Sequence, residues 1–383
     1  MKKAVTGLAA IGLALLAGCA TFAPPAASDA LFADERYGEP PAALQQLDLF
    51  ALSPAMDAYL QDHIRKRAVI LGHSRALFTS LTEDLRIDYD AAVTRTAGET
   101  FAAGAGNCLS LVILASAFAK RLDIPLRYQL VHGEGAWTRS GDLVFLNGHV
   151  NIVLDPHRRY GLTTGISEPG LVIDFAPARG VLSHDTEEVP ERLIVAMFMN
   201  NRAAETLVAG DARQAYWWAR ASIRTAAFAS AYNTLGVVYR RSGDFDRAEA
   251  ALQRGLALAP RDAQLMNNLA GLYEQTRRLA DAARLRARLA RLAAYQPFQF
   301  LDAGYRAMAA GDVNGAMALY RRELEHIPYS AEVHYAIAVA SARLGDARDA
   351  EQHLGEAMRL STNLRDRDIY AGKLQRLQAL QLN

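Results

Sequence analysis

The sequence has little cysteine and almost no net charge. Cys19 and Cys108 are its only two cysteines among 383 residues, and the formal net charge is +1. This charge gives no reason to expect a nucleic-acid partner. The sequence has no glycine loop of the phosphate-binding kind, and its His, Cys and carboxylate residues show no metal-ligand spacing, so we expect no cofactor and no metal site. Hydrophobic residues make up 51% of the chain, enough for the cores of about two domains.

Long apolar runs are also missing after the first residues. Lys2 and Lys3 precede a short apolar run at 5–16, which is too short to span a bilayer and is typical of a signal peptide at residues 1–18. The run ends in Leu-Ala-Gly-Cys19, which resembles a bacterial lipobox. That resemblance implies cleavage before Cys19 and acylation of its thiol, a stable membrane anchor. The next residue is alanine rather than aspartate, which by the same resemblance favours the outer membrane, facing the periplasm.

The anchor makes Cys108 the only free thiol of the mature chain. An oxidising compartment favours paired thiols, so an unpaired one is either deeply buried or kept for reactivity. The segment after Cys19 is rich in proline and alanine, and we expect residues 19–52 to be a lipid anchor and a flexible tether.

Residues 53–190 have the pattern of an α+β domain. Ser53-Pro54 is typical of a helix start, and a second helix is expected over 74–85. The glycine-containing break at 102–106 precedes an apolar helix that runs from Cys108 to Leu122. Alternating strands are expected at 127–131, 143–146, 149–154 and 171–175, with Asn147-Gly148 as a hairpin turn between the second and third.

From residue 195 the pattern contains only helices, and a period of 34 residues appears. Gly-Asp pairs recur at 210, 243, 311 and 345, and small residues recur in register at Ala248, Ala282, Ala316 and Ala350. This pattern resembles the tetratricopeptide repeat, a helix–turn–helix unit of 34 residues. We therefore expect about five units over 195–364, stacked into an all-α superhelix whose groove binds a protein or peptide, with a capping helix at 365–383.

Cys108 is the best candidate for a reactive group. A thiol attacks as thiolate, and the unpaired N–H groups of a helix start favour an anion. A neighbouring imidazole would help, and His149 begins a predicted strand at the margin of the sheet. Asp174, on the next strand, is the preferred residue to orient that imidazole. Asp155 is the rival, but it lies about 20 Å along the strand from His149.

These three residues resemble the catalytic set of the transglutaminase-like superfamily, which has a papain-like cysteine fold. The resemblance covers residues 70–180 and rests on Gly106-Asn-Cys-Leu-Ser110, on His149-Val-Asn-Ile152 and on Asp174-Phe-Ala-Pro177. It implies that Cys108 is the nucleophile, His149 the general base and acid, and Asp174 the orienting carboxylate. The aromatic residues that the family often has beside its cysteine and histidine are replaced by Leu109 and Val150.

Two functions follow from this pattern. The first is thiol-dependent acyl transfer or amide hydrolysis, as in a cysteine protease, an amidase or a transglutaminase-like acyltransferase, on a substrate recruited by the repeats. The second is a non-catalytic envelope scaffold, in which the N-terminal domain is degenerate and the repeat groove gathers partners. Retention of all three residue types of the triad favours the first.

Overall fold

The first helices begin where the sequence places capping residues. The computed structural model describes residues 29–140, 143–155, 170–173, 186–292, 298–361 and 364–381. Ser53 accepts a hydrogen bond from the N–H of Met56 and Pro54 opens the first long helix, as predicted. The helical segments before Cys108 are η1 (Asp29–Leu31), α1 (Asp34–Tyr37), α2 (Ala42–Gln45), α3 (Pro54–Tyr59), η2 (Leu60–Arg65), α4 (Lys66–Leu71), α5 (His73–Thr79), η3 (Ser80–Asp84) and α6 (Ala97–Ala103).

The helix that Cys108 begins is the centre of the N-terminal domain. This helix, α7 (Cys108–Arg121), has eleven buried residues among its fourteen. A helix that is apolar on all sides has to be covered on all sides. The short parallel pair β1 (Asp88–Tyr89) and β2 (Ala105–Gly106) lies directly before it and holds the chain that enters the helix.

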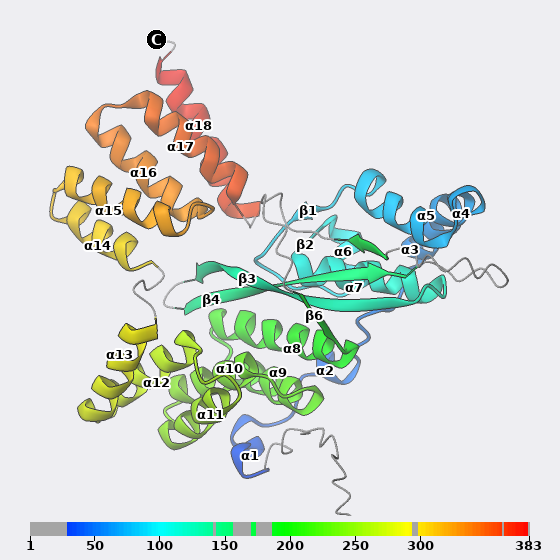
Figure 1. The fold of residues 1–383 in the computed structure, drawn as a ribbon, viewed down its shortest axis with the longest axis horizontal. Helices are drawn as coiled ribbons and strands as arrows, with labels where there is room; N and C mark the ends of the chain where they lie inside the picture. The colour runs from blue at the N-terminus through cyan, green and yellow to red at the C-terminus, as the bar shows by residue number, and fades with distance from the viewer. Residues whose placement is uncertain are drawn as a thin grey trace, which may run out of the picture.

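A four-stranded antiparallel sheet packs against α7 (Figure 1). Its order is β5-β4-β3-β6, and its strands are β3 (Leu126–Ser140), β4 (Leu143–Leu154), β5 (Leu171–Ile173) and β6 (Thr186–Val189). The predicted hairpin turn at Asn147-Gly148 is wrong. Asn147 lies inside β4, opposite Ala136 of β3, and the extra residues of the pair form a bulge between Val131 and Ala136.

All further described elements are helices, arranged in antiparallel pairs. The pairs are α8 (Glu191–Val208) with α9 (Ala212–Thr225), α10 (Ala229–Arg241) with α11 (Phe245–Leu258), α12 (Ala263–Gln275) with α13 (Leu279–Leu292), α14 (Gln299–Ala309) with α15 (Val313–His326), and α16 (Ala331–Leu344) with α17 (Ala347–Leu360). A last helix, α18 (Leu364–Gln381), packs on α17. Five helix pairs and a final helix therefore occupy the region in which the repeats and the capping helix were expected.

The recurring Gly-Asp pair has a local physical role. The glycine has a left-handed backbone in each turn, with φ of 88°, 73°, 85° and 82° at Gly210, Gly243, Gly311 and Gly345. The aspartate that follows caps the second helix of the pair, as when Asp312 accepts the N–H of Gly315 at 2.8 Å. In the third pair Arg277 takes the glycine's place with φ of 63°, an unfavourable conformation for a side chain.

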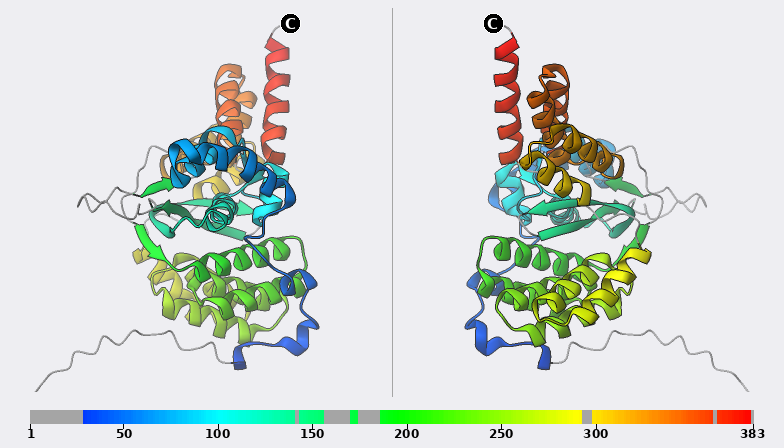
Figure 2. Two further views of the ribbon diagram at one scale, coloured as in Figure 1. Left: turned by 90° about the vertical axis from the view of Figure 1, so that its right-hand side faces the viewer. Right: turned by 90° about the vertical axis from the view of Figure 1, so that its left-hand side faces the viewer.

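The stack of pairs bends around the sheet. Figures 1 and 2 show α8 to α11 on one side of the strands and α16 to α18 on the other. The last helix returns to the N-terminal domain, where Arg367 of α18 pairs with Asp88 of β1 at 3.1 Å. One hydrophobic core runs from η1 through the sheet to α13, and a second core is formed by residues 298–340. The expected boundary at 190–195 thus falls at the start of α8, inside a continuous core.

The expected tether is partly wrong. Residues 29–37 pack against the repeat helices, with Leu31, Ala33 and Tyr37 buried. Tyr239 of α10 donates to the carbonyl of Leu31 at 2.7 Å. The predicted signal peptide and Cys19 lie outside the described residues. We call residues 29–37 the strap.

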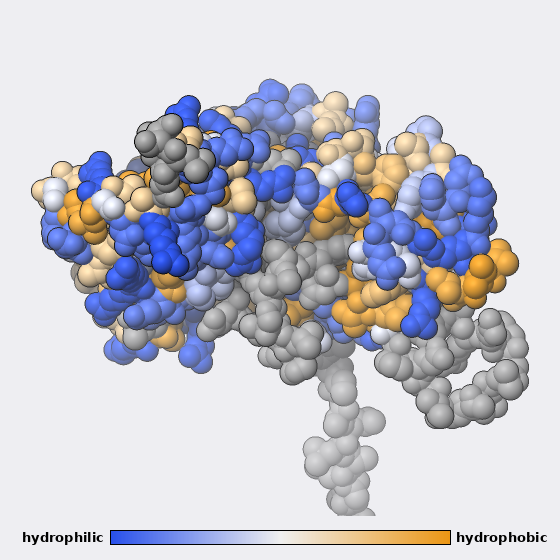
Figure 3. All heavy atoms as spheres, turned by 90° about the horizontal axis from the view of Figure 1, so that it is seen from above, coloured by the Kyte–Doolittle hydropathy of each residue, from blue (hydrophilic) through white to orange (hydrophobic). Residues whose placement is uncertain are grey.

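The most exposed large apolar side chains gather at the outer end of α4. Val69 and Ile70 are 86% and 85% exposed, and Gly72 ends the helix directly after them. Figure 3 shows hydrophobic atoms at this edge of the molecule.

None of the described helices is both long and apolar enough to cross a membrane.

Candidate functional site

Cys108 occupies the first position of α7, as predicted. Asn107 caps the helix: its Oδ1 accepts hydrogen bonds from the N–H and the hydroxyl of Ser110, both at 2.9 Å. Cys108 is a free, partly buried cysteine. The cap takes the N–H of Ser110, and the N–H groups of Cys108 and Leu109 also belong to the first turn, where a helix has no carbonyl of its own to accept them.

Gly106 serves packing at this turn. The residue is buried, and a Cβ there would lie 2.9 Å from the Cβ of Ser110 and 3.0 Å from a methyl carbon of Thr100. The absence of a side chain at Gly106 therefore has a structural reason, the close approach of Ser110 and Thr100. Gly104 has a left-handed backbone, with φ of 57°, and ends α6.

A buried ion pair holds the loop in front of the thiol. Arg95 pairs with Asp90 at 2.9 Å, and only 6% of the Asp90 side chain is exposed. The N–H of Arg95 also donates to the hydroxyl of Ser110 at 2.8 Å. The chain on both sides of Cys108 is thus fixed to one polar cluster, which gives the turn a defined position.

His149 lies inside β4, opposite Val131 of β3, and not at the start of a strand as predicted. The chain turns from the end of α7 into β3 at Leu126, which pairs with Leu154 of β4. The fourteen residues of α7 span about 20 Å. The five steps from Leu154 back to His149 span about 17 Å. The start of α7 and His149 are therefore at nearly the same distance from this turn.

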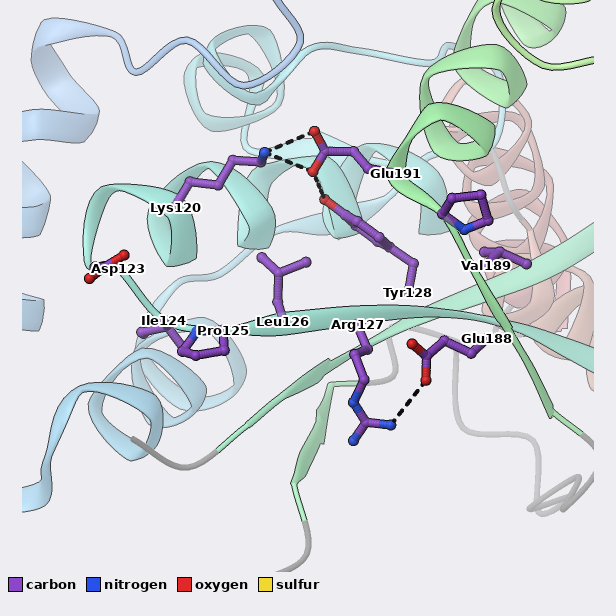
Figure 4. A pocket seen from close by; sticks show the side chains of 11 residues that line it. Lys120, Asp123, Ile124, Pro125, Leu126, Arg127, Tyr128, Glu188, Val189 and Glu191 are labelled. Atoms are coloured by element: carbon purple, nitrogen blue, oxygen red, sulfur yellow. Dashed lines mark hydrogen bonds and ion pairs between the residues drawn. The ribbon is translucent and has the colours of Figure 1, made fainter. Parts of the chain in front are cut away.

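The pleat of β4 places the side chain of His149 on the opposite face of the strand from the residues that pack under α7. Val150, Ile152 and Leu154 have no exposed surface, and Tyr128, the partner of Ile152, points toward α7 in Figure 4 while Arg127 points away. Side chains alternate between the two faces of a sheet along each strand. The side chain of His149 therefore lies on the same face as that of Arg127. The register places His149 opposite Val131, and the alternation of side chains does not bring the imidazole to the thiol.

The two carboxylate candidates differ in what the structure says of them. Asp174 lies outside the described residues. Asp155 follows the end of β4, six residues beyond His149, and is held by the guanidinium of Arg127 with contacts of 2.9 and 3.2 Å. The choice of Asp174 as the partner of the imidazole stays a prediction.

The hollow drawn in Figure 4 lies away from the thiol. It has a volume of about 510 Å³ and is lined by the end of α7, the start of β3 and the segment 188–191. Burial of Tyr128 raises the pKa of its phenol above the ordinary value, and Glu191 accepts its hydrogen bond at 2.9 Å. A second hollow of about 500 Å³ is closer to Cys108, since Leu111, one turn along α7, contributes to its wall.

Trp217 and Trp218 of α9 are packing residues. Both side chains are buried, and the indole N–H of Trp217 donates to the carbonyl of Tyr37 in the strap at 3.2 Å. The polar cluster around Thr94, described below, was missed by sequence reasoning. Thr94 has no motif around it, and its partners on α8 lie more than a hundred residues away along the chain.

Comparison with known proteins identifies one part of the chain. Residues 229–262 match the family model of the tetratricopeptide repeat. No curated protein matches the chain.

Solved structures with similarity to the chain include one described as "MamA MSR-1 C2", which is 23% identical over 44% of this chain and 97% of that chain, with a TM-score of 0.25. YrrB, described as a TPR protein with an unusual peptide-binding site, is 18% identical over 47% of this chain and 92% of its own, with a TM-score of 0.25. The Pseudomonas aeruginosa pilF structure is 19% identical over 49% and 94%, with a TM-score of 0.28. The second half of the chain is thus a stack of helix pairs that contains a tetratricopeptide repeat at 229–262.

Proposed function

We propose that this protein carries out thiol-dependent acyl transfer at Cys108 on a protein or peptide recruited by its repeats. The observation that carries the proposal is the position of the only thiol of the mature chain, at the capped start of a buried helix. A nucleophile placed there has a backbone N–H beside it for the oxyanion that forms during acyl transfer.

In the proposed reaction the thiolate of Cys108 attacks the carbonyl carbon of an amide. The resulting oxyanion collapses to a thioester as the amine leaves with a proton donated by His149. Water, or an amine of a second substrate, then attacks the thioester and releases the acyl group, and the thiol recovers its proton. Asp174 orients the imidazole in this scheme, as the resemblance to transglutaminase-like enzymes implies.

The rate at which iodoacetamide alkylates Cys108 tests the proposal. We expect Cys108→Ser to abolish labelling at this position and His149→Ala to slow labelling at neutral pH by at least about tenfold, because loss of a general base of this kind typically costs two or more orders of magnitude. Asp155→Asn is the matched control, since Asp155 is engaged by Arg127 far from the thiol. Labelling of the His149→Ala protein at the wild-type rate, followed by mass spectrometry, would overturn the proposal.

The second candidate function is a scaffold without catalysis. The alternation of side chains along β4 favours it, because His149 belongs to the set that points away from α7. A scaffold should recover the same partners from an envelope extract with wild-type protein and with Cys108→Ala. The full chain is needed for this comparison because α8 shares the core of the N-terminal domain. Partners retained only by Cys108→Ala, as expected of trapped substrates, would favour the enzyme instead.

We also propose that the protein is an outer-membrane lipoprotein that faces the periplasm and is anchored through Cys19. The ten steps from Cys19 to Asp29 can span at most about 35 Å. The strap begins at Asp29 and packs on α9 to α11, so the anchor would hold the repeat stack near the membrane surface. Cys19→Ala should move the protein from the membrane fraction to the soluble fraction, and an unchanged distribution would contradict the lipid anchor.

A further inference from the structure

Hydrogen bonds from the first repeat helix, α8, reach the surroundings of both ends of the thiol helix α7. At the far end Glu191 accepts hydrogen bonds from Lys120 of α7 and from Tyr128, each at 2.9 Å (Figure 4). At the near end Glu205 and Asn201 of α8 both reach Thr94. A single helix of the repeat stack is therefore hydrogen-bonded to residues at both ends of α7.

Thr94 joins α8 to the residue that precedes the thiol. Its N–H donates to Oε1 of Glu205 at 2.7 Å. Its hydroxyl oxygen accepts from Nδ2 of Asn107 at 2.8 Å and from Nδ2 of Asn201 at 3.2 Å. Oδ1 of Asn107 caps α7, so both polar atoms of its side-chain amide are hydrogen-bonded. The oxygen bonds to the helix of Cys108 and the nitrogen bonds to Thr94. We call Thr94, Asn107, Asn201 and Glu205 the Thr94 cluster.

This cluster is buried, so water cannot replace its hydrogen bonds when they break. Thr94 is 1% exposed and Asn107 is 7% exposed. Burial also raises the pKa of the Glu205 carboxyl, against the effect of its hydrogen bonds to Thr94 and of Arg202 at 3.0 Å. A buried polar network in which the members satisfy one another fixes their relative positions. A shift of α8 relative to α7 would break these bonds.

We infer that Thr94 and Glu205 are positioning residues for Cys108, through which the repeat stack sets the reactivity of the thiol. The inference rests on the proposed function, since it concerns the regulation of the same site. The link connects the row of repeat helices at one end with Cys108 at the other. The first helices of successive pairs, α8, α10 and α12, pack against one another, so a change in this row reaches Cys108 through α8 and the Thr94 cluster. Asn107 directly precedes Cys108 in the chain, so a displacement of Asn107 is passed to the thiol.

The test is the pH profile of Cys108 alkylation in the full chain, measured with iodoacetamide. Thr94→Val removes the hydroxyl and keeps the shape, and Glu205→Ala removes the acceptor of the Thr94 N–H. We expect each variant to slow alkylation at neutral pH by about fivefold and to move the midpoint of the profile upward, because the Asn107 cap loses its support. Thr94→Ser keeps the hydroxyl and Glu205→Gln keeps an acceptor oxygen, so both should restore the wild-type rate.

Glu191→Gln is the control on the same helix, because Glu191 contacts the other end of α7. It should leave the alkylation profile unchanged. The double variant Thr94→Val, Glu205→Ala should be no slower than either single variant if the two residues act through one path. Circular dichroism and thermal unfolding identify any variant that fails to fold, and the two conservative variants keep the test decisive in that case.

Two outcomes would overturn the inference. One is alkylation of Thr94→Val and Glu205→Ala at the wild-type rate, and the other is an equal slowing by Glu191→Gln, which would indicate general loosening. The proposed function fails separately, if His149→Ala leaves alkylation unchanged. Slow alkylation in Thr94→Val together with normal alkylation in His149→Ala would therefore uphold the positioning role and reject the triad.

Discussion

The phenol ring of Tyr37 lies flat on that of Tyr216, with ring centroids 4.0 Å apart and planes inclined by 8°. Tyr216 also accepts the N–H of Ala33 at 2.9 Å and donates to the carboxylate of Asp34. The strap is therefore a docked element of the repeat stack, although it precedes the whole N-terminal domain in the chain. Its contacts tie the start of the chain to α9, more than 180 residues later.

Removal of the Tyr216 hydroxyl should release the strap. Tyr216→Phe keeps the ring stack but leaves the buried N–H of Ala33 without its acceptor, which costs about 1–3 kcal/mol. We expect a lower thermal unfolding temperature and faster tryptic cleavage after Arg36. Tyr232→Phe is the control, a buried tyrosine of α10 outside the strap. Equal cleavage rates in the two variants would show that the hydroxyl does not hold the strap.

Glu323 should be essential for the second hydrophobic core. Its carboxylate is fully buried and accepts the N–H groups of Phe298, Phe300 and Leu301 at 2.8, 2.8 and 3.1 Å, so it caps α14 from a different helix. Glu323→Ala leaves these buried N–H groups without their acceptor, and we expect each lost acceptor to cost about 1–3 kcal/mol. Because residues 298–340 form a separate core, differential scanning calorimetry should show an early transition.

The control for this prediction lies on the same helix. Glu325→Ala removes an exposed carboxylate two residues away and should shift the unfolding temperature little. A similar, small effect of both variants would contradict the capping role of Glu323.

The features that sequence predicted are those with local causes. Ser53 and the Gly-Asp turns act within a few residues, so their helix boundaries follow from the chain itself. The errors involve distant partners. Asn147-Gly148 has the composition of a hairpin turn, but the long pairing of β3 with β4 places it inside a strand. The apolar residues of the strap gave no signal because their partners are far along the chain.

The same distinction applies to the candidate site. The place of Cys108 at a helix start depends on the local cap and was predictable. The direction of the His149 side chain depends on the register and bulge of β3 and β4, which no local pattern fixes. The Thr94 cluster depends on how α8 packs beside α7, and side-chain networks between elements have no periodic signature.

The last repeat pair should be sensitive to acid. Nδ1 of His334 and Nδ1 of His353 lie 2.8 Å apart. Nε2 of His334 faces the carbonyl of Pro328 at 3.2 Å, so it carries a proton, and in the neutral pair His353 is the donor between the two rings. Burial lowers the pKa of both imidazoles below the ordinary value, against the effect of Asp349 near His353.

A lowered pKa means that the folded state binds protons less readily than the unfolded state. The stability contributed by the pair is present above the ordinary histidine pKa of 6.5 and is lost as the pH falls through the folded values. Unfolding temperatures measured between pH 7.5 and pH 5 should therefore fall less steeply in His353→Gln than in wild type. His63→Gln, which changes an exposed histidine, should keep the wild-type slope, and a wild-type slope in His353→Gln would exclude the pair as the cause.

Close packing between paired helices should make Gly304 intolerant of any side chain. A Cβ at Gly304 of α14 would overlap the ring of Tyr320 on α15, which is 1% exposed and cannot move aside. Gly304→Ala should therefore destabilise this pair by about 1–3 kcal/mol.

Gly355 in α17 is the opposite case, because a Cβ there meets no atom within 4 Å. Gly355→Ala should stabilise the protein by about 0.5–1 kcal/mol, since alanine loses less backbone entropy in a helix. Chemical unfolding of the two variants should reveal opposite signs, and stabilisation of both would show that helix propensity, rather than the contact with Tyr320, decides the effect.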